Sequence, residues 1–170
     1  HIITTKIEHH AVLHTCEYLE KQGFEVTYLD VDEYGMINLD ELKNAITDQT
    51  ILISIIYANN EIGTIMPIRE IGAIARKHGV LFHTDAVQAA GHIPIDVKAD
   101  NIDLLTLTAH KFHGPKGTGA VYIKQGVKIG SLVYGGGQEK GIRAGTENTA
   151  GILGLGLAAV HAKENMKENS

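Results

Sequence analysis

The sequence predicts an α/β domain in which helices flank a mixed, mostly parallel β-sheet. Two observations carry this prediction. Short hydrophobic runs of strand length alternate along the chain with segments in which apolar residues recur at helical spacing. One run, residues 51–56, is apolar at nearly every position and rich in β-branched residues, which is typical of a strand buried on both faces. Strands that alternate with helices in this way form largely parallel sheets.

The first half of the chain is expected to contain a strand at residues 1–5, a helix at 11–19, a strand at 24–29, a short helix at 38–46 and the buried strand at 51–56. The first helix places Val12, Cys16 and Leu19 on one face, and Gly23 lies just past its end, where glycine often terminates a helix. Asn38 precedes the second helix and is a good N-cap, because its side-chain oxygen can accept a backbone N–H of the first turn.

The second half continues with a helix at residues 67–78, strands at 80–85, 102–107 and 120–123, and an apolar helix that begins near residue 148. Pro67 suits the first turn of its helix, and Gly79 lies just past the end. Residues 108–119 connect two strands and contain several glycines and a proline, so we expect a constrained loop with little helix. This loop carries Lys111 between two histidines.

Composition and charge argue against several classes of protein. Of the 170 residues, 44% are hydrophobic and 21% charged, as in an ordinary globular domain, and the net charge of −5 argues against a broad nucleic-acid surface. No apolar run approaches the ~20 residues that a membrane span needs. The single cysteine cannot form an internal disulfide, and without a signal peptide the chain is expected to be cytoplasmic. It opens inside an expected strand, which suggests a piece of a longer polypeptide.

Polar side chains directly follow three of the expected strands. Asn59 and Asn60 follow the buried strand, Asp85 ends the next one, and His110 and Lys111 follow the strand after that. In open α/β sheets, ligands bind beyond the carboxyl ends of the strands. We therefore expect these side chains to converge at one edge of the sheet and to form a ligand site.

Lys111 and Asp85 together favour a covalently held cofactor. A lysine forms a Schiff base only when it is deprotonated, and partial burial or nearby positive charge favours that form. A pyridinium ring held by such a lysine needs a carboxylate at its ring nitrogen, and Asp85 is the candidate. Gln88 could donate to the phenolic oxygen of the ring. The alternatives are a plain surface lysine and an aspartate that caps a helix near residues 86–88.

Other polar groups carry weaker signals. His9 follows the first strand and could stack on a planar cofactor; the alternative is a histidine at a helix start. His10 and His14 have a spacing that can bind zinc, but no third ligand falls at a recognisable spacing, so we predict no metal site. Residues 143–146 precede the last helix, where an arginine and Thr146 could contact a phosphate; the alternative is a loop arginine with a threonine cap.

Several motifs, taken in order, are similar to those of one enzyme family. They are Glu8-His9, Asn59-Asn60-Glu61-Ile62-Gly63, His83-Thr84-Asp85-Ala86-Val87-Gln88, His110-Lys111 with Gly114-Pro115-Lys116-Gly117, and Arg143-Ala144-Gly145-Thr146. With these motifs the chain resembles, over essentially its whole length, the cysteine desulfurases of the NifS/IscS type. Those proteins are pyridoxal-phosphate enzymes of the class V aminotransferase group. The resemblance implies the fold of the large domain of such a transferase.

The resemblance also implies roles for single residues. Lys111 and His9 would be the catalytic residues. The cofactor would be held by Lys111 (covalent bond), His9 (stacking on the ring), Asp85 (ring nitrogen), Gln88 and Asn60 (phenolic oxygen), Thr108 and His110 (phosphate), and Thr146 (phosphate of the other subunit's cofactor in a homodimer). L-cysteine would become L-alanine while a mobile cysteine takes the sulfur as a persulfide. An iron–sulfur scaffold or another acceptor protein would then receive it.

The family pattern extends beyond this chain. Residues 1–170 match the central part of the large, cofactor-binding domain, which is expected to be truncated at both ends. The N-terminal phosphate loop, the C-terminal small domain, the loop cysteine and the arginine for the substrate carboxylate have no counterpart here. Cys16 falls at a helix-core position and is expected to be a buried structural thiol. We therefore expect this chain alone to desulfurate cysteine poorly or not at all.

The sequence leaves three alternative functions open. A related pyridoxal-phosphate enzyme, such as a selenocysteine lyase or a small-amino-acid aminotransferase, would keep Asp85 and Lys111 but act on another substrate. A non-catalytic docking partner in sulfur transfer or iron–sulfur assembly would tolerate replacement of both residues. A metal-binding module would retain zinc on dialysis.

Overall fold

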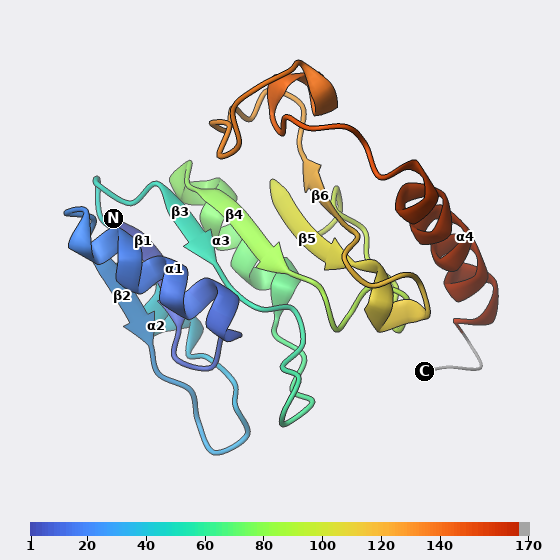
Figure 1. The fold of residues 1–170 in the computed structure, drawn as a ribbon. Helices are drawn as coiled ribbons and strands as arrows, with labels where there is room; N and C mark the ends of the chain where they lie inside the picture. The colour runs from blue at the N-terminus through green and yellow to red at the C-terminus, as the bar shows by residue number, and fades with distance from the viewer. Residues whose placement is uncertain (167–170) are drawn as a thin grey trace.

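Within residues 1–166, which the computed structural model describes, the strands form one six-stranded sheet in the order β2-β1-β3-β4-β5-β6 (Figure 1). Neighbouring strands run parallel, except that β6 runs antiparallel to β5. The strands are β1 (Ile2–Thr5), β2 (Val26–Leu29), β3 (Leu52–Ser54), β4 (Leu81–Asp85), β5 (Leu104–Thr108) and β6 (Gly119–Ile123). The predicted mixed, mostly parallel α/β fold is confirmed.

Helices cover both faces of the sheet. They are α1 (His10–Lys21), α2 (Leu39–Ala45), α3 (Ile68–His78) and α4 (Thr149–Asn165), with the short 3₁₀ helices η1 (Ala109–Phe112) and η2 (Gln138–Gly141). In Figure 1, α1 lies in front of the sheet and α3 behind it, while α4 packs beside η1. None of the helices in residues 1–166 has the length and apolar content that a bilayer span requires.

The main hydrophobic core lies between the sheet and helices α2 and α3. Ile3, Ile53 and Phe82 are register partners on neighbouring strands, so their side chains point to the same face, where they are fully buried. Leu42 of α2 and Ile71 of α3 belong to the same buried cluster. Burying a large apolar side chain contributes roughly 1.5–3 kcal/mol, so this face is what attaches α2 and α3 to the sheet.

The apolar run at residues 51–56 is buried as predicted only from Ile53 onward, because Ile51 is 55% exposed, and its regular strand is shorter than predicted. Only Leu52–Ser54 form β3. Beyond it, Ile55 and Tyr57 still donate backbone N–H groups to the carbonyls of His83 and Asp85. Residues 53–57 are therefore buried and stay paired with β4, and this pairing carries the chain to the carboxyl edge of the sheet.

The predicted helix ends are confirmed with one refinement. The Oδ1 atom of Asn38 accepts the backbone N–H groups of Asp40 and Glu41 at 2.8 and 3.3 Å, so Asn38 caps α2. Gly79 ends α3 in the left-handed region, with φ of 69°. Pro67 occupies the N-cap of α3 rather than its first turn.

The loop at residues 108–119, which carries Lys111, contains more helix than predicted. Residues Ala109–Phe112 form η1, a single 3₁₀ turn that begins directly after β5. The sharp reversal comes later, where His113 has a φ of 66° and Gly114 approaches Ala109 so closely that a Cβ would lie 2.7 Å from the Ala109 Cβ. The prediction of little helix was wrong at η1, because the glycines constrain only the second half of the loop.

The last helix, α4, begins at Thr149, so Thr146 lies too far before it to be its N-cap. Asn148 is its N-cap, since its Oδ1 accepts the backbone N–H of Gly151 at 3.0 Å. Thr146 therefore does not cap α4, and that alternative is wrong. The helix is apolar as expected, and the end of the charged tail, residues 167–170, lies outside the described residues.

Candidate active site

The parallel strands end at one edge of the sheet, and the expected site residues lie at the strand ends or in the segments that follow them. His9 follows β1, Asn60 follows β3, and Asp85 is the last residue of β4. His110 and Lys111 lie on η1, immediately after β5. The strand order β1-β3-β4-β5 places these ends next to one another (Figure 1). The structure thus brings these residues to the carboxyl edge, where ligands bind in open α/β sheets.

Asp85 is a buried carboxylate with one oxygen left free. It is 8% exposed, and its Oδ1 accepts the backbone N–H of Val87 at 2.9 Å. This bond closes a turn rather than capping a helix, because residues 87–92 form turns. Its Oδ2 accepts no hydrogen bond from residues 1–166 and is available to an N–H group of a ligand. Gln88 lies half-buried in the same turn.

His83 belongs to one of the sequence motifs, but no role was predicted for it. It lies on β4, two residues before Asp85. Its Nδ1 is 2.8 Å from Oγ of Ser54 on β3, and its Nε2 is 3.4 Å from Oγ1 of Thr106 on β5. Burial lowers the pKa of His83, and the charge of Asp85 opposes this only in part. A neutral His83 adds no positive charge beside Asp85, which leaves that carboxylate free to pair with a cationic ligand.

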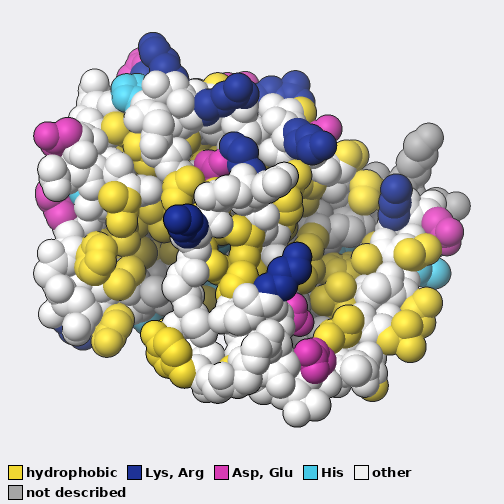
Figure 2. All heavy atoms as spheres, turned by 90° about the horizontal axis from the view of Figure 1, so that it is seen from above, with side chains coloured by type: hydrophobic (Ala, Val, Ile, Leu, Met, Phe, Trp, Pro, Cys, Tyr) yellow, Lys and Arg dark blue, Asp and Glu magenta, His cyan; other side chains and the backbone are white. Residues whose placement is uncertain are grey.

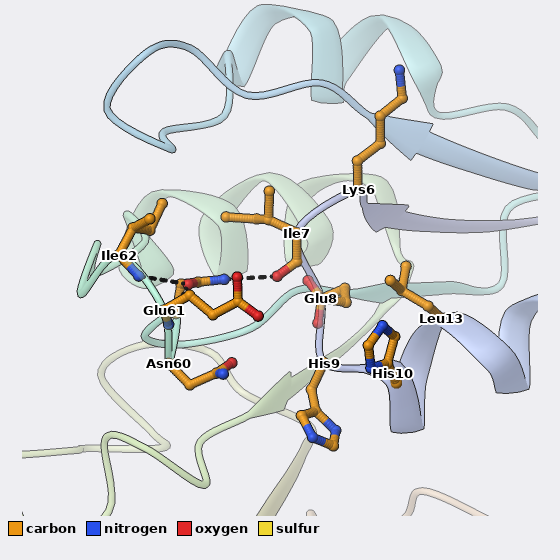
Figure 3. Close-up of a pocket in the computed structure, with 10 residues that line it drawn as sticks. Lys6, Ile7, Glu8, His9, His10, Leu13, Asn60, Glu61 and Ile62 are labelled. Atoms are coloured by element: carbon orange, nitrogen blue, oxygen red, sulfur yellow. Dashed lines mark hydrogen bonds between the residues drawn. The ribbon is translucent and has the colours of Figure 1, made fainter.

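The ring of His9 is oriented by the start of α1. Ala11 donates its backbone N–H to Nδ1 of His9 at 3.1 Å, so His9 is the N-cap of the helix. Because Nδ1 accepts this bond, the proton of the neutral ring lies on Nε2. Figure 3 shows the side chains of His9 and Asn60 pointing to the same side, away from Lys6 and Ile62. A flat ligand at this edge can therefore meet both.

Glu8 is a buried carboxyl group beside His9. Its Oε1 accepts the hydroxyl of Thr5 and the backbone N–H of Ile56, each at 2.8 Å, whereas its Oε2 is buried without a partner in residues 1–166. Burial raises the pKa of Glu8 to about 7, against the opposing effect of these two hydrogen bonds. The group borders a cavity of about 280 Å³, which Figure 3 shows and which is lined by Lys6, Ile7, Glu8, His9, His10, Leu13, Asn59, Asn60, Glu61 and Ile62.

The raised pKa of Glu8 predicts a pH-dependent stability. The folded state holds the Glu8 proton more tightly than the unfolded chain, whose value is 4.5, so the stabilising effect is complete below pH 4.5 and is lost as the pH rises to about 7. The free energy of unfolding should fall in this window by up to about 1.4 kcal/mol per pH unit. Urea unfolding between pH 5 and 8 measures this fall, and Glu8→Gln should remove it. An equal slope in both proteins would contradict the assignment.

The lysine turn is anchored through its backbone, while its side chain stays free. The Thr108 hydroxyl donates to the carbonyl of Thr118 at 3.2 Å, and its oxygen lies 3.1 Å from Nδ1 of His110. Nε2 of His92 donates to the carbonyl of Lys111 at 3.0 Å. The Lys111 side chain is exposed. A hydroxyl and an imidazole beside each other suit a phosphate, and the same turn carries the exposed Lys111.

Thr146 lies apart from the other expected site residues. It is exposed, in a segment whose backbone is tied by Ala144 to Val133 and by Gly145 to the Gln138 side chain. In Figure 1 most of residues 124–148 lies at the end of the sheet opposite to η1. Thr146 and Lys111 are therefore not brought together within this chain. That Thr146 contributes to the site of a second subunit stays a prediction.

Cys16 and the neighbouring histidines do not extend the site. Cys16 is 4% exposed in α1, and burial raises the pKa of its thiol. The expectation of a buried thiol is confirmed. His10 and His14 stack with ring centroids 5.1 Å apart. Among residues 1–166, no group of three or more His, Cys, Asp or Glu side chains is arranged to hold a metal ion.

Comparison with known proteins decides the family. The profile of the aminotransferase class-V family matches residues 1–170. The chain belongs to the aminotransferase class-V family. Its similarity to cysteine desulfurases, expected from the motifs, is confirmed: the chain is 65% identical over 170 residues to "Cysteine desulfurase IscS" of Clostridium botulinum and equally identical to that of Methanosarcina thermophila. It spans 43% and 42% of these relatives, less than half of their length.

Solved structures of the family share the fold. A "NIFS-like protein" superposes with a TM-score of 0.95 at 47% identity, over 98% of this chain and 46% of that one. SspA, solved in complex with cysteine, superposes with a TM-score of 0.93 at 47% identity, over 95% of this chain and 47% of that one. The fold described above is therefore shared with both of these solved structures.

Proposed function

We propose that the protein containing this chain is a pyridoxal-phosphate-dependent cysteine desulfurase, which converts L-cysteine to L-alanine and passes the sulfur to a cysteine thiol. The observation that carries the proposal is the placement of Asp85 and Lys111 at the ends of neighbouring strands, one as a buried acceptor and the other as an exposed amine. The names of the similar proteins support cysteine as the substrate, and so does the cysteine bound to SspA.

The residues at this edge fit pyridoxal phosphate. Oδ2 of Asp85 is unpaired in the described residues and can accept the ring N–H. The paired hydroxyl and imidazole of Thr108 and His110 fit the phosphate. His9 and Asn60 point to the same side, where His9 would cover the ring and Asn60, together with the half-buried Gln88, would reach its phenolic oxygen.

The cofactor, when bound, withdraws electrons from the α-carbon of the substrate. Asp85 would hold the proton of the ring nitrogen in place, because its carboxylate is buried and is oriented by the hydrogen bond from Val87. Lys111 removes and returns a proton at the α-carbon through its amine. His9 excludes water from one face of the site, with a ring fixed by its bond from Ala11.

The sulfur-accepting thiol is proposed to come from outside these 170 residues. Cys16 is the single cysteine of the chain, and a buried thiol with a raised pKa is a poor nucleophile. Cys16→Ala in the full-length protein should leave the rate of alanine formation within about twofold, because the side chain contributes packing and no chemistry. Loss of persulfide on the enzyme in this variant would overturn that assignment.

The proposal is tested with the full-length protein, cysteine and a thiol reductant. With the reductant, stoichiometric alanine and sulfide are expected; without it, an enzyme-bound persulfide should be found by mass spectrometry. Selenocysteine as the only productive substrate would favour a lyase, and amino transfer from alanine to a keto acid would favour an aminotransferase. The homodimer, with Thr146 serving the partner's phosphate, and an iron–sulfur scaffold as sulfur acceptor belong to this proposal as well.

A further inference from the structure

Two hydrogen bonds connect the segment that bears His9 to the segment that bears Asn60. The carboxyl of Glu8 accepts the backbone N–H of Ile56 at 2.8 Å. In the opposite direction, Nδ2 of Asn59 donates to the carbonyl of Ile7 at 2.8 Å, a bond that Figure 3 draws as the dashed line ending at Ile7. Glu8 precedes His9 and binds the segment that leads to Asn60. Asn59 precedes Asn60 and binds the segment that leads to His9.

Asn59 also shapes the turn that presents Asn60. Its Oδ1 accepts the backbone N–H groups of Glu61 and Ile62 at 2.8 and 3.1 Å. Its own carbonyl accepts the N–H of Gly63 at 3.1 Å. One amide side chain thus folds the turn and fastens it to the end of β1, so the position of Asn60 depends on Asn59.

Burial separates the anchoring residues from the exposed ones. Glu8 and Asn59 are 5% and 7% exposed, whereas His9 and Asn60, the next residues along the chain, are exposed. Hydrogen bonds that are sheltered from water hold their geometry better than surface contacts. A buried residue that fixes backbone beside an exposed functional one is suited to positioning.

We propose that Glu8 and Asn59 are positioning residues that hold His9 and Asn60 at a fixed separation around the cofactor ring. This inference rests on the proposed function, because the ring is that of pyridoxal phosphate. The pair is called the Glu8–Asn59 clamp. Neither side chain needs to touch the cofactor, since each acts through backbone groups of the neighbouring segment.

The two residues can be disabled without removing the segments. Glu8→Ala deletes the acceptor for Ile56, whereas Glu8→Gln keeps an oxygen acceptor. Asn59→Asp keeps the acceptor for the 61–62 turn but places a carboxylate against the Ile7 carbonyl. Asp103→Ala is the matched control: Asp103 is also a buried carboxylate that accepts a strand N–H, that of Phe82 at 3.0 Å, but lies before β5, away from the site edge.

The test uses the full-length protein and reads the circular dichroism of the bound cofactor in the visible range, its dissociation constant, and KM and kcat for cysteine. Glu8→Ala and Asn59→Asp should each weaken cofactor binding about tenfold and diminish the dichroism, whereas Glu8→Gln should remain within about twofold of wild type. Asp103→Ala should lower the melting temperature without changing the dichroism. In a His9→Ala background, Glu8→Ala should add little further loss, because the two changes act through one group.

Unchanged dichroism and cofactor affinity in both Glu8→Ala and Asn59→Asp would overturn the proposed clamp. An equal loss of dichroism and affinity in Asp103→Ala would also overturn it, and so would losses in Glu8→Ala and His9→Ala that add up in the double variant. Should Glu8→Ala fail to fold, Asn59→Asp decides alone. A wild-type protein that binds the cofactor but does not desulfurate cysteine would overturn only the proposed function. A wild type that binds no cofactor would overturn both.

Discussion

Replacing Lys111 by alanine in the full-length protein is expected to abolish cysteine desulfuration, with a loss of about 10³-fold or more. Under the proposed function, this change removes two contributions together: the covalent attachment of the cofactor and the amine that moves the α-proton, of which the second alone is worth about 10²–10⁴-fold. Alanine formation measured under single-turnover conditions checks the rate. Borohydride treatment of the wild type, followed by peptide mass spectrometry, should locate the cofactor on Lys111.

The same loop supplies the control for this prediction. Lys116 is also an exposed lysine between β5 and β6, so Lys116→Ala changes the charge of the loop equally. Its activity should remain within a few-fold of wild type. A comparable loss in both variants would show that the charge of the loop, and not the position of Lys111, is what matters. Covalently bound cofactor in Lys111→Ala would refute the assignment directly.

Asp85→Asn is expected to lower the rate of desulfuration by about 10²-fold to 10³-fold, which is the usual effect of removing one preorganised electrostatic contact. The asparagine can still accept the N–H of Val87 through its amide oxygen, so the turn after β4 should remain. What is lost is the negative charge that we propose to stabilise a proton on the ring nitrogen. The rate should fall chiefly in kcat, with cofactor affinity changed less.

Asp103→Asn is the matched control for this change. Asp103 and Asp85 are each 8% exposed and each accept one backbone N–H, so the same substitution removes a buried charge from a similar environment. Asp103 instead pairs with Lys124 at 2.7 Å, and its loss should reduce stability but not kcat. A full kcat in Asp85→Asn would show that the ring nitrogen is not held by this carboxylate.

Most of the fold was accessible from local patterns. The continuous apolar run at residues 51–56 predicted a strand buried on both faces, and Asn38 and Gly79 predicted two helix ends, because each signal depends on neighbouring residues only. The short η1 was missed. Its four residues precede the glycines of the loop, and its backbone is held by Thr118, at the far end of the same loop, and by His92, from the turn after β4.

The candidate site was predictable in part, through the rule that parallel strands present ligand-binding residues at their carboxyl ends. Asp85 and Lys111 follow strands directly, and the sequence order alone placed them at one edge. Glu8 was visible only as the neighbour of His9. Its proposed function as an anchor depends on the hydrogen bond from Ile56, which is remote in sequence. No local sequence pattern predicts such a bond.

The sequence by itself determined the alternation of strands and helices, the class of fold and the residues that follow each strand, since these depend on hydrophobic periodicity and on short-range turn and cap chemistry. Only the tertiary structure decided which side chains are buried and what they bind. The assembled sheet brought Ile56 to Glu8 and Ile7 to Asn59, and it left Oδ2 of Asp85 without a hydrogen-bond partner among residues 1–166. Burial and hydrogen bonding are properties of the assembled sheet, because they depend on contacts between segments that are distant along the chain.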